Sequence, residues 1–76
     1  MNKPRRELLE KLNTRLDKLK CDLELIRDEE QEYIDNTPEG LQGGERAENA
    51  EIAVSNMDDA INNLEEAASS IEESTQ

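Results

Sequence analysis

Apolar residues recur at alternating three- and four-residue steps through the first half of the chain, from Leu9 to Tyr33. This spacing puts them on one face of an α-helix, whereas the side chains of a β-strand alternate with a period of two. Pro4 suits the first helical turn, where its missing N–H costs nothing. The pattern therefore predicts a helix over residues 4–36. Its heptad a positions are Leu9, Leu16, Leu23 and Glu30, and its d positions are Leu12, Leu19, Ile26 and Tyr33.

A segment rich in turn-forming residues interrupts this pattern between residues 37 and 44. It contains Pro38 and all three glycines of the chain. Because a proline pushes the residue before it out of the α-helical region, the first helix has to end ahead of Pro38. Thr37 is placed to cap a single short helical turn that follows it. Residues 37–44 are therefore predicted to form the turn.

A second heptad stripe predicts a helix over residues 45–73. Its g positions are the small residues Ala53, Ala60 and Ala67, while its e positions are all acidic. Small residues let another helix backbone approach closely, so this helix is expected to have two different neighbours. Its a positions are Ala47, Val54, Ile61 and Ala68, and its d positions are Ala50, Met57, Leu64 and Ile71.

Two helices of similar length joined by a short connection favour an antiparallel pair. We expect an all-α fold, an antiparallel two-helix hairpin of the coiled-coil type, forming one domain over residues 1–76. A domain of this size rarely builds a sufficient core alone. Dimerisation into a four-helix bundle is the expected remedy, and docking on a foreign helix or groove is the alternative. The residues expected to build the core and the dimer are Leu9, Leu12, Leu16, Leu19, Leu23, Ile26, Tyr33, Val54, Met57, Ile61, Leu64 and Ile71.

Acidic residues outnumber basic ones by 20 to 9, which gives a formal net charge of −11. This balance argues against direct binding to nucleic acid. Residues 1–20 contain seven basic and three acidic side chains, whereas residues 21–36 contain one basic and seven acidic ones. An antiparallel hairpin therefore gathers nearly all the net charge at its loop end, where it attracts a protein with a basic surface. The contacts expected there are Glu29, Glu32, Asp35, Glu39, Leu41, Glu45 and Glu48.

Residues for catalysis, cofactor binding or metal binding are not visible. The chain has no histidine and one cysteine, which excludes an internal disulfide and the ordinary zinc sites. Cys21 lies at the outermost heptad position and is interpreted as an incidental exposed thiol. Glu30 is either a helix edge facing solvent or the partner of Arg27 or Arg46 in a buried ion pair that fixes the register. We expect no enzyme and no cofactor.

Targeting and membrane segments are also not visible. The N-terminal segment is basic, but no apolar run of signal-peptide length follows it. The chain contains no stretch near the ~20 apolar residues that span a bilayer. We therefore expect a cytoplasmic protein without a membrane partner.

Residues 28–46 read DEEQEYIDNTPEGLQGGER. This segment resembles a set of short, mostly uncharacterised helical-hairpin proteins of bacteriophages, prophages and Gram-positive bacteria. They carry a similar DEEQEYxDNxPExLQGSER signature before an acidic, alanine-rich helix. Gly44 departs from the pattern at its serine, which removes a side-chain cap from the second helix. The resemblance implies a phage or prophage setting in the cytoplasm of a bacterial host.

The leading functional hypothesis is a small phage-type accessory protein that binds a host or defence protein and inhibits it. A second hypothesis is mimicry of a nucleic-acid backbone, which predicts competition with nucleic acid and steep weakening of binding by salt. A third is a structural dimerisation or scaffold module whose acidic residues only keep it soluble. The three hypotheses differ in the partner that binds the hairpin, which is a host or defence protein, a nucleic-acid-binding enzyme or a second copy of the chain.

Overall fold

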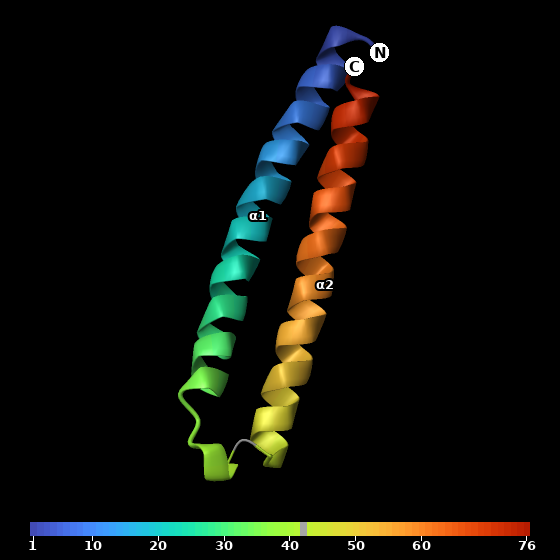
Figure 1. The fold of residues 1–76 in the computed structure, drawn as a ribbon. Helices are drawn as coiled ribbons and strands as arrows, with labels where there is room; N and C mark the ends of the chain where they lie inside the picture. The colour runs from blue at the N-terminus through green and yellow to red at the C-terminus, as the bar shows by residue number, and fades with distance from the viewer. Residues whose placement is uncertain (42) are drawn as a thin grey trace.

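The chain folds as two long helices joined by a tight connection, in a computed structural model that describes residues 1–41 and 43–76 (Figure 1). The helices are α1 (Lys3–Asp35) and α2 (Glu45–Ser74), with a short 3₁₀ turn, η1 (Glu39–Leu41), between them. They run antiparallel, and no strand occurs within the described ranges. The all-α helical hairpin predicted from the two heptad stripes is confirmed. Gln42, within the predicted turn, lies outside the described residues.

Helix α1 has a side-chain cap at its start and a backbone cap at its end. The side-chain oxygen of Asn2 accepts a hydrogen bond from the backbone N–H of Arg5 at 2.9 Å, and Pro4 occupies the first turn. This cap starts the helix one residue before the predicted position. At the other end the N–H of Asn36 donates to the carbonyl of Glu32 at 2.9 Å. The helix ends ahead of Pro38 because a proline disfavours helical backbone in the residue before it.

The connection is closed by backbone hydrogen bonds. The N–H of Leu41 donates to the carbonyl of Pro38 at 2.8 Å, and the N–H of Gly44 donates to the carbonyl of Leu41 at 3.1 Å. Gly44 caps α2 without a side-chain hydrogen bond, as its departure from the serine of the signature predicts. Helix α2 extends one residue beyond the predicted end, and the Thr75 hydroxyl donates to the carbonyl of Glu72 at 2.7 Å.

The hairpin is a thin rod with a small core. Its Cα atoms extend over 59 × 14 × 13 Å, and both termini lie at the end opposite the loop (Figure 1). Among the described residues, the buried ones are Ala47, Ala50 and Ile61, all on α2, and each keeps 3–5% of its surface exposed. No residue within Lys3–Asp35 is buried to this extent. Two small residues at the loop end of α2 let α1 pack closely there, but they bury little apolar surface.

Candidate interaction surfaces

Helix α1 does not face α2 with the stripe that the sequence pattern favours. The a residues Leu9, Leu16 and Leu23 are half-buried between the helices, as predicted. The other half-buried row lies at e positions rather than d positions, and it includes Asn13. The Asn13 side-chain amide donates to the carbonyl of Ala68 at 3.0 Å, across the hairpin. The residues of α1 that face α2 are therefore those at a and e positions, and the d residues predicted for the core or the dimer lie at the margin.

Two ion pairs across the hairpin accompany this rotation of α1. The e residues Lys20 and Arg27 meet acidic e residues of α2, with Lys20 Nζ 3.6 Å from Glu65 and Arg27 Nη1 2.8 Å from Asp58. Their aliphatic stems cover the margin of the core while their charged ends stay near solvent. Sequence reasoning missed these residues, although the basic e row of α1 opposite the acidic e row of α2 was the signal that could have revealed them.

The rotation leaves an apolar face on one side of the hairpin. We define it as Leu12, Leu19, Ile26 and Tyr33 of α1 with Ala53, Ala60 and Ala67 of α2. The four α1 side chains are 41%, 56%, 55% and 47% exposed, although they were predicted for the core or the dimer. The α1 and α2 residues flank the same side of the interface. The e rows of the two helices meet on one side, which leaves the d row of α1 and the g row of α2 together on the other side. Consistent with this, Leu12, Leu19 and Ile71 line one shallow groove, and Tyr33 and Arg46 line another.

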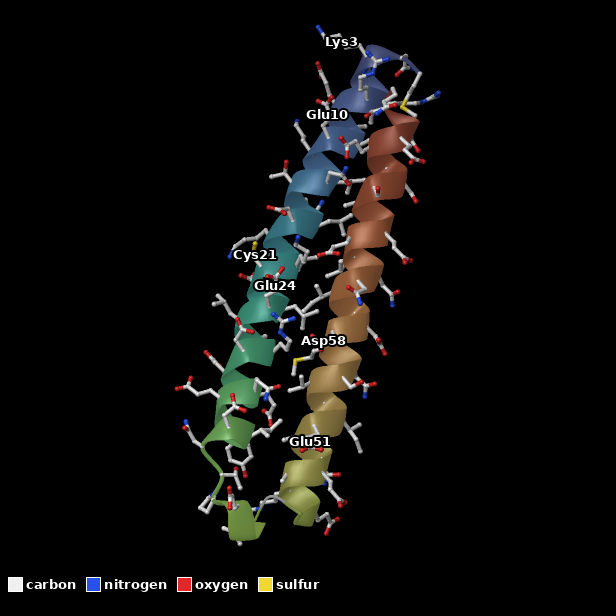
Figure 2. The ribbon with its side chains drawn as sticks, viewed as in Figure 1. Lys3, Glu10, Cys21, Glu24, Glu51 and Asp58 are labelled. Carbon is white, nitrogen blue, oxygen red and sulfur yellow. The ribbon has the colours of Figure 1, made fainter. Side chains whose placement is uncertain are left out.

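The opposite side of the hairpin is charged. The guanidinium of Arg27 binds Asp28 as well as Asp58, and its hydrogen bonds to Asp58 and then to Asp28 raise the pKa of Arg27. Figure 2 shows Asp58 on α2 and Glu24 on α1 along the middle of the rod. The hairpin therefore has one side rich in ion pairs and one side lined by leucine, isoleucine, tyrosine and alanine.

The loop end gathers the residues predicted to contact a basic partner. All seven are exposed, and Leu41 has 64% of its surface exposed. Within residues 1–41 and 43–76, no lysine or arginine forms an ion pair with any of these six carboxylates. The seven predicted contact residues are the carboxylates Glu29, Glu32, Asp35, Glu39, Glu45 and Glu48, together with Leu41.

Two further residues singled out in the sequence have definite positions. Cys21 is a free, exposed thiol, as its heptad position predicts. Glu30 is half-buried, and in the described structure it pairs with neither Arg27 nor Arg46. The interpretation of Glu30 as an ion-pair partner is wrong, because Arg27 is already held by Asp28 and Asp58.

The described residues offer no cluster of three or more candidate metal ligands. Over the same residues, neither helix combines the length and the apolar character needed to cross a bilayer. Comparison of the chain with protein-family models, with curated proteins and with solved structures gives no match.

Proposed function

We propose that this chain is a small, non-enzymatic protein-binding module that uses the apolar face to associate with helices of another polypeptide. One observation carries the proposal: four large side chains at heptad spacing, from Leu12 to Tyr33, remain about half exposed. Scattered exposed apolar residues are ordinary on protein surfaces, but a continuous row along a helix matches the helix-in-groove mode of recognition. The alanines beside the row let a partner helix approach closely.

Two neighbouring residues provide a matched test of this proposal. Ile26 lies on the apolar face and is 55% exposed, while Leu25 points outward from the hairpin and is 64% exposed. Since neither side chain is buried in the hairpin, Ile26→Glu and Leu25→Glu should both keep the helical content. Tagged variants are used to capture proteins from a bacterial lysate that also contains the untagged chain, and the captured proteins, the untagged chain included, are quantified by mass spectrometry. Partners lost with Ile26→Glu and retained with Leu25→Glu support the proposal, whereas equal capture by both variants rejects it.

A second candidate function is capture of a basic protein by the acidic loop end. The exposure and lack of ion pairing of its carboxylates favour this candidate, because an unneutralised acidic end attracts basic surfaces within a Debye length of ~10 Å at 0.1 M salt. The resemblance of residues 28–46 to phage and prophage proteins supports a target in the bacterial host cytoplasm. Inhibition of a host or defence protein would follow if that basic surface is its working surface.

Charge reversal at the two ends of the rod tests the second candidate. One variant reverses three charges at the loop end and combines Glu29→Lys, Glu32→Lys and Glu48→Lys. The control variant changes the net charge by the same amount at the terminal end and combines Glu66→Lys, Glu72→Lys and Glu73→Lys. Loss of the partner only with the first variant supports loop-end binding. Equal retention by both variants rejects it. Displacement of the partner by duplex DNA, with binding that weakens steeply as salt rises, would assign the loop end to nucleic-acid mimicry.

A further inference from the structure

The apolar face occupies the central part of one side of the rod. That whole side measures 59 Å by 14 Å between its outermost Cα atoms and offers on the order of 800 Å², the contribution of one side to a standard interface. The apolar face, from Leu12 to Tyr33, covers about 32 Å of this length at ~1.5 Å per helical residue. The hairpin needs such burial, because Ile61 is the only large residue among the buried ones that the structure describes. A partner that covers this face would supply most of the core that the hairpin lacks.

The face is nearly symmetric about its own midpoint. Along α1 the midpoint lies between Leu19 and Ile26, and the outer members, Leu12 and Tyr33, lie at equal distances from it in sequence. The contacts Lys20–Glu65 and Arg27–Asp58 place this midpoint opposite the stretch of α2 between Ala60 and Ala67. A second copy turned end over end about that point therefore meets matching positions. Leu19 then faces Ile26 of the second copy, Leu12 faces its Tyr33, and the alanine rows of the two α2 helices face each other.

The charges at the margin of the face favour the same arrangement. Arg15 lines the groove formed by Leu12 and Leu19. Glu29 occupies the equivalent heptad position two heptads further along α1. When the copies are turned end over end, Arg15 of each lies beside Glu29 of the other. The two Asp22 side chains, midway between them in the same row, then meet at the midpoint, and each is paired with Lys18 of its own helix at 2.6 Å. When the loops lie at the same end, the two acidic loop ends are side by side. Arg15 and Glu29 then face neutral residues of α2 in the second copy, which are Asn56, Asn63 and Ser70. Complementary charges select orientation in this way.

We infer that the occupant of the apolar face is a second copy of this chain, packed face to face with its loop at the opposite end of a four-helix bundle. This inference rests on the proposed binding function of the face and names its partner. The basic half of α1 in one copy then lies beside the acidic loop half of α1 in the other. Each end of the bundle presents one acidic loop next to one pair of termini.

Sedimentation equilibrium tests the association. The wild-type chain is expected to sediment at twice its 8.6 kDa mass. Ile26→Glu should raise the dimer dissociation constant by ~100-fold or more, because two unpaired carboxylates enter the apolar interface. Leu25→Glu should leave the constant unchanged. A monomeric wild type, or a dimer that survives Ile26→Glu, overturns the inference. A monomer that still captures a foreign protein through Ile26 would refute the dimer and leave the proposed binding function standing.

Spin-label distances test the orientation. The labels are placed in a Cys21→Ser background at Gly40→Cys, where a side chain meets open space, or at Lys3→Cys near the termini. In the inferred dimer, two Gly40→Cys labels are separated by a distance on the order of the 59 Å rod. In a mixture of the two variants, a Gly40→Cys label of one copy lies close to the Lys3→Cys label of the other, because each loop is beside the partner copy's termini. Two Gly40→Cys labels within about 20 Å of each other would overturn the arrangement, because loops at the same end are separated only by packed helices spaced ~10 Å apart.

Charge exchange tests the register. Arg15→Glu alone should weaken the dimer by roughly tenfold, because it places like charges together at two symmetric positions. Adding Glu29→Arg should restore the affinity, since the pair is then reversed but still complementary. Failure of the double variant to recover would overturn the register. Helical content provides the folding control for every variant.

Discussion

Substitution of Ile61 measures how much the small core of the hairpin contributes to stability. Ile61 is 5% exposed, so Ile61→Ala removes three buried carbon atoms from between the helices. Truncation of a buried isoleucine to alanine costs about 2–5 kcal/mol. The lower half of this range is expected, because two helices can close around the gap more readily than a multilayered core can. Domains have about 0.05–0.15 kcal/mol of stability per residue, so this loss is a large fraction of the total.

Ile52 provides the matched control, because it lies on the same helix and is 59% exposed. Ile52→Ala makes the same chemical change with the same effect on helix propensity, and it should alter stability by no more than about 0.5 kcal/mol. Urea unfolding is followed by circular dichroism, and the midpoints are compared at unchanged slope. All samples need the same chain concentration, because association stabilises the folded state by mass action. Equal losses from Ile61→Ala and Ile52→Ala would refute the placement of the core.

Three further substitutions probe other features of the rod, and urea unfolding measures each of them. Asn13→Leu should stabilise the hairpin by about 1 kcal/mol, because the side-chain oxygen of Asn13 is buried without a partner. Destabilisation would show that the hydrogen bond from Asn13 to Ala68 contributes more than the unpaired oxygen costs. Gly44→Ser should be about 1 kcal/mol more stable than Gly44→Ala, since both place a Cβ 3.1 Å from the carbonyl oxygen of Leu41 but only serine caps α2. Arg27→Met should lower the midpoint in dilute buffer and have a smaller effect at high salt, because its ion pairs are partly exposed; an effect independent of salt would point to lost packing instead.

The heptad spacing and the turn residues are sufficient to predict both helices and the hairpin. A run of leucines at three- and four-residue steps has no alternative in a strand, and Pro38 with the glycines leaves one place for the chain to reverse. These signals are local, so a single sequence contains them in full. The second helix starts at residue 45 as predicted, and the other three helix bounds differ from the observed ones by one residue. Side chains outside the stripe, such as Asn2 and Thr75, cap two of these ends.

The rotation of α1 could not be read from its apolar pattern alone. Leu9, Leu16 and Leu23 fit between the helices with either flanking row, so apolar spacing does not distinguish the d row from the e row. Pairing of Lys20 and Arg27 with carboxylates of α2 decides between them, and that depends on how the two helices align. The loop-end residues are easier to place, because charge and proximity to the turn are both visible in the sequence. Their role as contacts remains a prediction.

The placement of both termini at one end of the rod has a practical consequence for protein engineering (Figure 1). A host protein that received this hairpin within one of its surface loops would keep the two cut ends of that loop close together. The inserted helices would then stand out as a stalk about as long as the rod itself, 59 Å. Such a stalk would display the acidic tip far from the host's own surface, where a graft at Gly40 could be presented with little interference.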